Sequence, residues 1–269
     1  MIGLFLGGTD FPDLIIKNLK IKKIKYFIID LTNNNKFIND INSHHISIGK
    51  FGKILNLINI NKCKKVLFAG KIVKPKLSSI KLDFKGLYYI PRIIKASKLG
   101  DAAILKELIK ILAEQKIKVI RSNFFNPELT LNKCNPTILK PNKKELIQIK
   151  NGINSLKKLN AHDHVQGLII RNNNIIAKET TKGTKKMLLS IKKLKNFKGI
   201  LIKFPKIKQD LRADLPTVGL DTLKDCKKAG IKGVVLKAKQ NIFLDKKKCI
   251  NFANKNKIFI TIKWKKYLF

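Results

Sequence analysis

The start of the chain constrains its fold most, because a short apolar run ends in two glycines and a helical pattern follows directly. Residues 2–6 are apolar, Gly7 and Gly8 come next, and apolar residues recur at helical spacing over 12–19. Strand, glycine turn and helix in this order are typical of the βα unit of nucleotide-binding folds. A plain tight turn explains the two glycines equally well, because the full G-x-G-x-x-G pattern is absent.

The N-terminal half continues to alternate strand and helix patterns. We expect strands at 26–29 and 66–69, with a helix around 54–58 between them. Gly70 ends the second of these strands beside Lys71, and it is a further weak candidate for phosphate binding. This alternation predicts an open parallel sheet.

Helical spacing returns after Pro91. Asp101 is well placed to cap a helix whose apolar face contains Leu105 and Leu112, and residues 119–120 are suited to the next strand. The segment 126–142 then carries three prolines and several asparagines, a poor setting for regular structure.

We place a domain boundary in this proline-containing segment, since 269 residues exceed the usual size of one domain. The prediction is an α/β protein of two domains. A Rossmann-like domain with a parallel sheet covers 1–134, and a second α/β domain covers 135–269.

The second domain reads as mixed strands and helices, although its strand order does not follow from the pattern. The expected elements are a hairpin of 167–170 with 175–177, a helix from Thr184, a strand at 200–204, a helix ending at Gly230, strands near 234–235 and 242–244, and a last helix before a strand at 258–263.

The formal net charge of +41 suggests nucleic acid as one partner. The lysines are nevertheless spread along the whole chain among many Ile and Asn residues, so a solvated surface is the preferred interpretation. No window approaches a membrane span of ~20 apolar residues, and the start lacks the pattern of a secretory signal. We expect a cytoplasmic protein with reduced cysteines, whose lipid contacts are peripheral. The sequence does not indicate an oligomeric state.

The loop between the strand at 200–204 and the following helix holds the main candidates for chemistry. Its polar residues are Lys203, Gln209, Asp210, Arg212, Asp214 and Thr217. Carboxylates here suit Mg²⁺ and an attacking water, while the cations suit phosphate oxygens. Alternatively, Asp214 and Thr217 organise a turn before Pro216 and cap the next helix. The histidines at 44, 45, 162 and 164 are expected on the surface.

Several stretches in a fixed order resemble the LpxI family of UDP-2,3-diacylglucosamine pyrophosphatases of lipid A biosynthesis. They are Gly-Leu-Phe-Leu-Gly-Gly at 3–8 with Pro12, residues 48–54, Phe-Ala-Gly-Lys-Ile-Val-Lys-Pro at 68–75, Gly100-Asp101, residues 182–188, and Arg-Ala-Asp-Leu-Pro-Thr-Val-Gly at 212–219.

The resemblance implies two domains with the substrate held between them. It also implies Mg²⁺-dependent hydrolysis of UDP-2,3-diacylglucosamine to UMP and 2,3-diacylglucosamine 1-phosphate, with contact to the inner-membrane surface. The essential aspartate of the family falls on Asp214. With the residues above, the candidate metal ligands are Asp214 and Asp210. The candidate substrate-binding residues are Gly7, Gly8, Gly70, Lys71, Gly183, Thr184, Lys203, Gln209, Arg212 and Thr217.

The chain departs from the family at Lys182 and Lys185, where two acidic residues are usual, although Glu179 remains available just upstream. A weakened homologue, or a carrier that binds a UDP-sugar or lipid without turnover, is therefore the alternative. For the acyl chains, the apolar segment 77–94 is a candidate near the cleft between domains. Ordinary core is the slightly preferred explanation of that segment.

Overall fold

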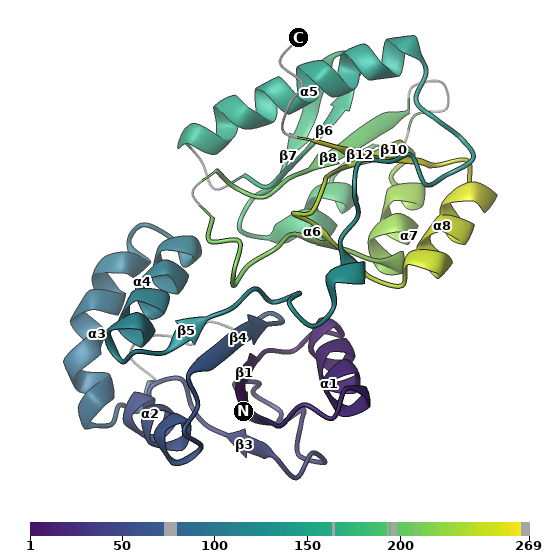
Figure 1. Ribbon diagram of the computed structural model, residues 1–269. Helices are drawn as coiled ribbons and strands as arrows, with labels where there is room; N and C mark the ends of the chain where they lie inside the picture. The colour runs from purple at the N-terminus through teal and green to yellow at the C-terminus, as the bar shows by residue number, and fades with distance from the viewer. Residues whose placement is uncertain (73–79, 163–164, 193, 195–197, 208, 265–269) are drawn as a thin grey trace. The chain divides into compact units, whose positions relative to one another are not determined.

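The computed structural model describes residues 1–72, 80–162, 165–192, 194, 198–207 and 209–264 (Figure 1). The chain forms two compact units. The first contains Met1–Pro127 together with Asp210–Asp214, and the second contains Glu128–Gln209 together with Leu215–Phe269. The predicted α/β class with two domains is confirmed. The short segment Asp210–Asp214 belongs to the first unit, although along the chain it lies between the two parts of the second unit.

The first unit is built on a five-stranded sheet in which every pair of neighbouring strands is parallel. Its order is β3-β2-β1-β4-β5. The central strand β1 pairs Ile2 with Tyr26 on one side and with Lys65 on the other. The chain therefore reverses its direction across the sheet between β1 and β4, as in the predicted Rossmann-like fold. The strands are β1 (Ile2–Leu6), β2 (Tyr26–Asp30), β3 (Ser43–His45), β4 (Lys65–Ala69) and β5 (Lys118–Val119).

Helices cover both faces of this sheet. Phe5, Phe27 and Phe68 of the strands pack into one core with residues of three helices, α2, α3 and α4. Figure 1 shows α1 on the opposite face, where its Ile15 and Leu19 are buried. The helices are α1 (Phe11–Ile21), α2 (Phe51–Ile60), α3 (Phe84–Ser97) and α4 (Asp101–Glu114).

Two helix starts differ from the predictions. α3 begins at Phe84, and Pro91 lies inside it, because Asp83 caps the helix by accepting a 2.8 Å hydrogen bond from Gly86 N. α4 has Gly100 at the N-cap position, so Asp101 lies in the first turn and does not cap it. The Asp101 carboxylate in the first turn still interacts favourably with the positive end of the helix dipole.

The second unit contains a mixed five-stranded sheet of order β12-β10-β8-β6-β7. Its first three strands are mutually parallel, whereas β6 is antiparallel to β8 and forms the predicted hairpin with β7. A separate parallel pair joins β9 to β11. The strands are β6 (Gly167–Arg171), β7 (Asn174–Lys178), β8 (Gly199–Lys203), β9 (Thr217–Val218), β10 (Ile231–Lys237), β11 (Ile242–Phe243) and β12 (Phe259–Lys263).

This second sheet lies between one long helix and three short ones. Ile149 and Leu156 of α5 pack against one face, on residues such as Ile170 and Ile202. Ile169 and Leu201 point to the other face and join the core that contains the three short helices. The sequence did not predict α5. The helices are α5 (Lys143–His162), α6 (Gly183–Leu189), α7 (Leu220–Lys228) and α8 (Lys246–Lys255).

Candidate active site

The glycines that end β1 and β4 lie against each other at the point where the sheet order reverses. Gly7 N donates to Ala69 O and Gly8 N donates to Lys71 O, both at 2.9 Å. A Cβ on Gly70, whose φ is +86°, would lie 2.6 Å from Gly7 O. These glycines therefore allow two backbones to approach closely, and in this conformation the amides of Gly7 and Gly8 already have backbone acceptors.

The segment Asp210–Asp214 forms a tight turn within the first unit. Asp210 O accepts hydrogen bonds from Ala213 N at 3.2 Å and from Asp214 N at 3.1 Å. Arg212 O accepts from Ser122 N at 2.8 Å, and Ala213 packs on the core formed with α2, α3 and α4. These contacts tie the turn to the first unit and hold Asp214 half-buried beside it.

Charge pairing inside this turn is strong. Arg212 donates from Nε and Nη2 to the carboxylate of Asp210, and its backbone N–H adds a 2.9 Å bond to Oδ1. The Arg212 side chain lowers the pKa of Asp210 more than partial burial raises it, and the Lys106 charge lowers it further. The turn therefore presents Asp210 as a carboxylate, with a guanidinium beside it.

A second polar cluster lies in the second unit, where β8 ends and α6 begins. Lys203 Nζ lies 3.4 Å from Glu179 Oε1 and donates to Thr184 Oγ1. Thr184 in turn donates a 2.8 Å bond to Glu179 Oε1. Lys203 and Glu179 are both buried. The sequence named Lys203 and Thr184 as site residues, and the structure brings them together through Glu179.

Glu179 belongs to this cluster, although it is not among the site residues predicted from the sequence. The sequence indicated Glu179 only as an acidic residue close to positions 182 and 185. Its burial against Lys203 depends on the pairing of β6 with β7 and β8, which the sequence pattern does not reveal. Its second oxygen, Oε2, lies where a Cβ on Gly167 would be only 2.8 Å away. The lysines at 182 and 185 are exposed near the start of α6. Glu179 therefore neutralises Lys203 although positions 182 and 185 carry no acidic residue.

Other predicted residues have structural contacts of their own. Gln209 is buried, and its Oε1 accepts from Gln166 Nε2 and Lys206 N, both at 2.9 Å. Thr217 lies in β9, and Gly219 occupies the N-cap of α7 without a side-chain cap. The alternative in which Thr217 caps that helix is therefore wrong. Gly183 adopts φ +82° at the start of α6.

Histidine and cysteine chemistry finds little support in the described part of the chain. His44 and His45 are exposed, and the predicted surface position of these two is confirmed; His164 lies outside the described residues. All four cysteines are free, as predicted, and burial raises the pKa of the Cys226 thiol. A buried thiol of raised pKa is a poor nucleophile.

Family comparisons cover both units. The LpxI N-terminal domain matches residues 1–129, and the LpxI C-terminal domain matches residues 133–261. The chain belongs to the LpxI family. A relative from Caulobacter vibrioides, UDP-2,3-diacylglucosamine pyrophosphatase LpxI, is 27% identical over 223 residues, which is 80% of this chain and 80% of the relative. The resemblance found in the sequence is thus confirmed. Among the described helices of this LpxI-family protein, none has the length and apolar character to cross a membrane.

Proposed function

We propose that this protein hydrolyses the pyrophosphate bond of UDP-2,3-diacylglucosamine, a step of lipid A biosynthesis. The observation that carries the proposal is the match of both LpxI domains along the chain, with a relative of that name aligned over 223 residues. Water attacks one phosphorus, the bridging P–O bond breaks, and the products are UMP and 2,3-diacylglucosamine 1-phosphate.

Asp214 is the proposed catalytic carboxylate. The neighbouring residue Arg212 is proposed to help the turn bind phosphate. Arg212 neutralises Asp210 and adds hydrogen-bond donors, which suit the oxygens of a pyrophosphate. Charge stabilisation of this kind is the main requirement of phosphoryl transfer, because little covalent catalysis is needed. Lys203 and Thr184 are proposed to contact substrate from the second unit.

Mg²⁺ is the proposed cofactor. Within the described residues no group of three or more His, Cys, Asp and Glu side chains gathers as a metal site. Mg²⁺ commonly needs only one or two carboxylates when substrate phosphates and water complete its shell. Asp214 and Asp210, whose backbones are joined across one turn, fit that requirement. When bound, the ion would offset the charge of the pyrophosphate.

The test compares Asp214→Asn with Asp221→Asn, a matched change at an exposed acid of α7. Purified proteins would receive UDP-2,3-diacylglucosamine with Mg²⁺, and UMP release would be followed by chromatography. We expect Asp214→Asn to lose at least about 100-fold in rate, as for other electrostatic catalytic groups, and Asp221→Asn to retain wild-type activity. Absence of UMP release by the wild-type protein would refute the activity. Equal rates for all three would refute the role of Asp214.

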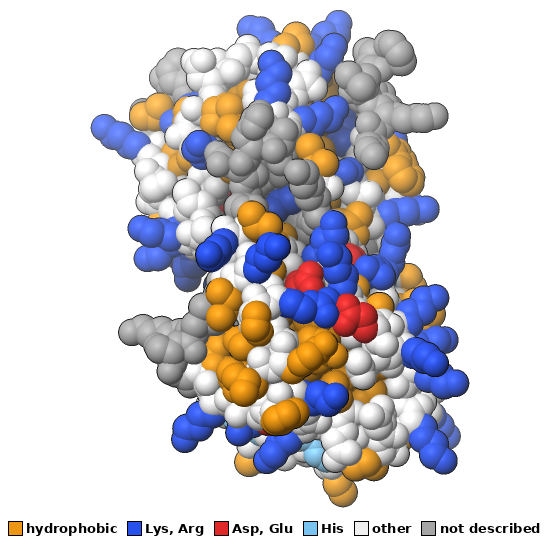
Figure 2. Space-filling model, turned by 90° about the vertical axis from the view of Figure 1, so that its left-hand side faces the viewer, with side chains coloured by type: hydrophobic (Ala, Val, Ile, Leu, Met, Phe, Trp, Pro, Cys, Tyr) orange, Lys and Arg blue, Asp and Glu red, His pale blue; other side chains and the backbone are white. Residues whose placement is uncertain are grey.

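We also propose that the protein works in the cytoplasm at the surface of the inner membrane. Three apolar side chains of α3 face solvent: Phe84 is 87% exposed, Leu87 60% and Tyr88 71%. Figure 2 shows hydrophobic side chains gathered on this face of the first unit, with lysines and arginines around them. Such a surface suits an anionic bilayer, which attracts cations and accepts aromatic side chains.

A further inference from the structure

A groove lies in the second unit, between α5 and the carboxyl ends of three parallel strands. Phe204 follows β8, Lys237 ends β10 and Lys263 ends β12. Ligands of α/β sheets commonly bind outside the carboxyl ends of the strands. The volume of the groove is about 380 Å³, and its described lining includes none of the residues proposed for hydrolysis. The groove is therefore a candidate for a separate ligand site.

The walls of this groove are apolar. Ile149 and Leu156 of α5 are buried on the core of the second unit, and Ile153 of the same helix is partly buried against it. Ile207 and Trp264 line the groove as well, but both are exposed to solvent. Packed core residues hold the walls in place, while the exposed apolar side chains would gain stability if a ligand covered them.

Lysines border this apolar space. Lys150 and Lys157 lie seven positions apart on α5, which is about two helical turns, so they project from the same side of the helix. Lys237 and Lys263 add two cations from the strand ends, and Asn154 adds a neutral amide. The described lining contains no Asp or Glu. A lysine stem packs on apolar surface while its ammonium group stays in water, so the groove offers both a place for hydrocarbon and a place for an anion.

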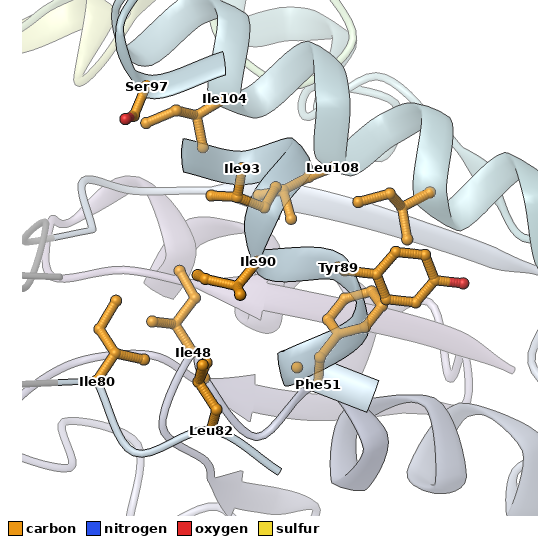
Figure 3. Close-up of a pocket in the computed structure, with 13 residues that line it drawn as sticks. Ile48, Phe51, Ile80, Leu82, Tyr89, Ile90, Ile93, Ser97, Ile104 and Leu108 are labelled. Atoms are coloured by element: carbon orange, nitrogen blue, oxygen red, sulfur yellow. The ribbon is translucent and has the colours of Figure 1, made fainter. Parts of the chain in front are cut away.

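The apolar pocket of the first unit lacks such charges. It lies between α2, α3 and α4 (Figure 3), and its described lining contains no Lys, Arg, Asp or Glu. In Figure 3 the hydroxyl of Tyr89 points away from the space, so the tyrosine presents only its ring. The groove beside α5 therefore differs from this pocket because it combines apolar walls with positive charge.

Residues of the segment 77–94 contribute to that uncharged pocket. Phe84, Leu87 and Tyr88 of the segment are nevertheless exposed, so its interpretation as ordinary core is wrong for them. Leu77 lies outside the described residues. The place of this segment beside the acyl chains of the substrate stays a prediction.

We propose that the groove beside α5 binds one long-chain fatty acid, with its carboxylate at the lysines and its alkyl chain along the apolar walls. A cavity of ~150 Å³ can hold a benzene ring, so a groove of about 380 Å³ holds roughly a dozen chain carbons. One alkyl chain therefore fills the groove, whereas a phospholipid would leave its second chain uncovered. Four cations and no acid in the described lining favour an anion over a neutral or cationic amphiphile.

Trp264 allows the position of the ligand to be tested directly, because it lines the groove and is the single tryptophan of the chain. The wild-type protein would be titrated with dodecanoate that carries a terminal bromine, a quencher of tryptophan fluorescence on contact. We expect saturable quenching that unlabelled dodecanoate reverses. Two further titrations distinguish other sources of an alkyl chain. One uses vesicles of bromine-labelled phosphatidylglycerol, and the other adds UDP-2,3-diacylglucosamine as a competitor.

The first variant fills the groove. Ile153→Trp places a larger side chain between the walls, and Ile147→Trp is its control, since Ile147 is exposed on the same helix and lies outside the described lining. Calorimetry with dodecanoate would give the affinities. We expect Ile153→Trp to lose about tenfold or more, because several methylenes lose their burial, and Ile147→Trp to stay within about twofold of wild type.

The second variant reverses charge, and it decides the test if the first fails to fold. Lys150→Glu with Lys157→Glu removes two cations of the groove, whereas Lys144→Glu with Lys158→Glu makes the same change of net charge at exposed positions of α5 outside the described lining. We expect a loss of about tenfold or more in the first pair and less than about twofold in the second, because a charge acts mainly on a partner close to it.

Ligand chemistry gives the last comparison. Hexanoate should bind at least about 100-fold more weakly than dodecanoate, since each buried methylene contributes roughly fourfold in affinity. Dodecyltrimethylammonium, which has the same chain and the opposite charge, should not bind measurably. Equal losses in the two lysine pairs would overturn the proposal, as would the absence of quenching by the labelled fatty acid.

Two other results would also overturn it. Quenching by the labelled vesicles alone would show that the groove contacts a bilayer, and displacement of the fatty acid by UDP-2,3-diacylglucosamine would show that it is part of the substrate site. The proposed hydrolysis is tested separately. Wild-type protein that binds dodecanoate in the groove without releasing UMP would refute that activity and support the fatty-acid site.

Discussion

Arg212 holds both carboxylate oxygens of Asp210, with Nε 3.0 Å from Oδ1 and Nη2 2.7 Å from Oδ2. This pairing lowers the pKa of Asp210. We predict that Arg212→Leu raises that pKa toward its ordinary value. Lys106→Leu should raise it less, because Lys106 acts only through its charge. A carbon-detected NMR titration of the Asp210 carboxyl would measure both shifts, and an unchanged value in Arg212→Leu would contradict the pairing.

The same pair gives a direction for stability against pH. A carboxyl whose pKa is depressed in the folded state contributes stability above its unfolded pKa, and this contribution is lost as pH falls through the folded pKa. Arg212→Leu should therefore be less stable than wild type near neutral pH by about 0.5 kcal/mol, typical of a partly exposed pair. The difference should vanish in strong acid. Urea denaturation of both proteins at neutral pH and in strong acid would measure this difference in the free energy of unfolding.

The buried Lys203 and Glu179 allow a sharper test of stability. Their side chains are only 7% and 10% exposed, so removing one leaves the other buried without its oppositely charged partner. We predict that Glu179→Leu costs about 3 kcal/mol in the free energy of unfolding, whereas Glu179→Leu combined with Lys203→Leu costs less than the single change. Chemical denaturation of the wild type, of Glu179→Leu and of the double variant would measure these free energies of unfolding. A double variant that is less stable than Glu179→Leu would show that Lys203 has other important contacts.

Two glycines with similar backbone angles should respond differently to alanine. Gly70 and Gly183 have φ of +86° and +82°. A Cβ at Gly70 would meet Gly7 O at 2.6 Å, whereas a Cβ at Gly183 would meet nothing within 4 Å. Gly183→Ala should cost about 1 kcal/mol from backbone strain alone, and Gly70→Ala clearly more, since its strand end must also move. Equal thermal midpoints for the two variants would contradict this account of Gly70.

Strongly apolar strands and glycine turns were predictable because they are short, local patterns. The elements of the first unit therefore followed from the sequence, apart from β3, whose three residues include two histidines, and the starts of α3 and α4. The helix α5 was missed because it is rich in Lys and Asn. Its start did carry a signal: Asn142 and Glu145 bond each other's backbone N–H at 2.9 and 2.8 Å, an arrangement that a capping motif in the sequence can reveal.

Contacts between residues far apart along the chain could not be predicted from the sequence. Glu179 and Lys203 are separated by 24 positions and meet only through the order of the second sheet. The turn at Asp210–Asp214 was predicted as a polar loop, but its packing on the first unit depends on Ala213 finding a core far away in the sequence. Local composition names the candidate side chains, whereas tertiary packing decides their neighbours.

The exposed face of α3 predicts how the protein meets a membrane. We expect the wild-type protein to sediment with vesicles of phosphatidylglycerol and phosphatidylethanolamine, and to bind less as salt rises, because lysines attract the anionic surface. The variant Phe84→Ser, Leu87→Ser, Tyr88→Ser should lose most of this binding, since its apolar side chains no longer enter the interface.

The matched control replaces three exposed isoleucines elsewhere in the same unit, at positions 21, 41 and 60, with serine. It removes a similar apolar area but leaves α3 intact, so its vesicle binding should equal that of wild type. Equal losses in both variants would show that binding depends on general surface character and not on α3. Light scattering in solution separates a further outcome: if wild type is a dimer and the α3 variant a monomer, the face contacts a second copy of the chain rather than lipid.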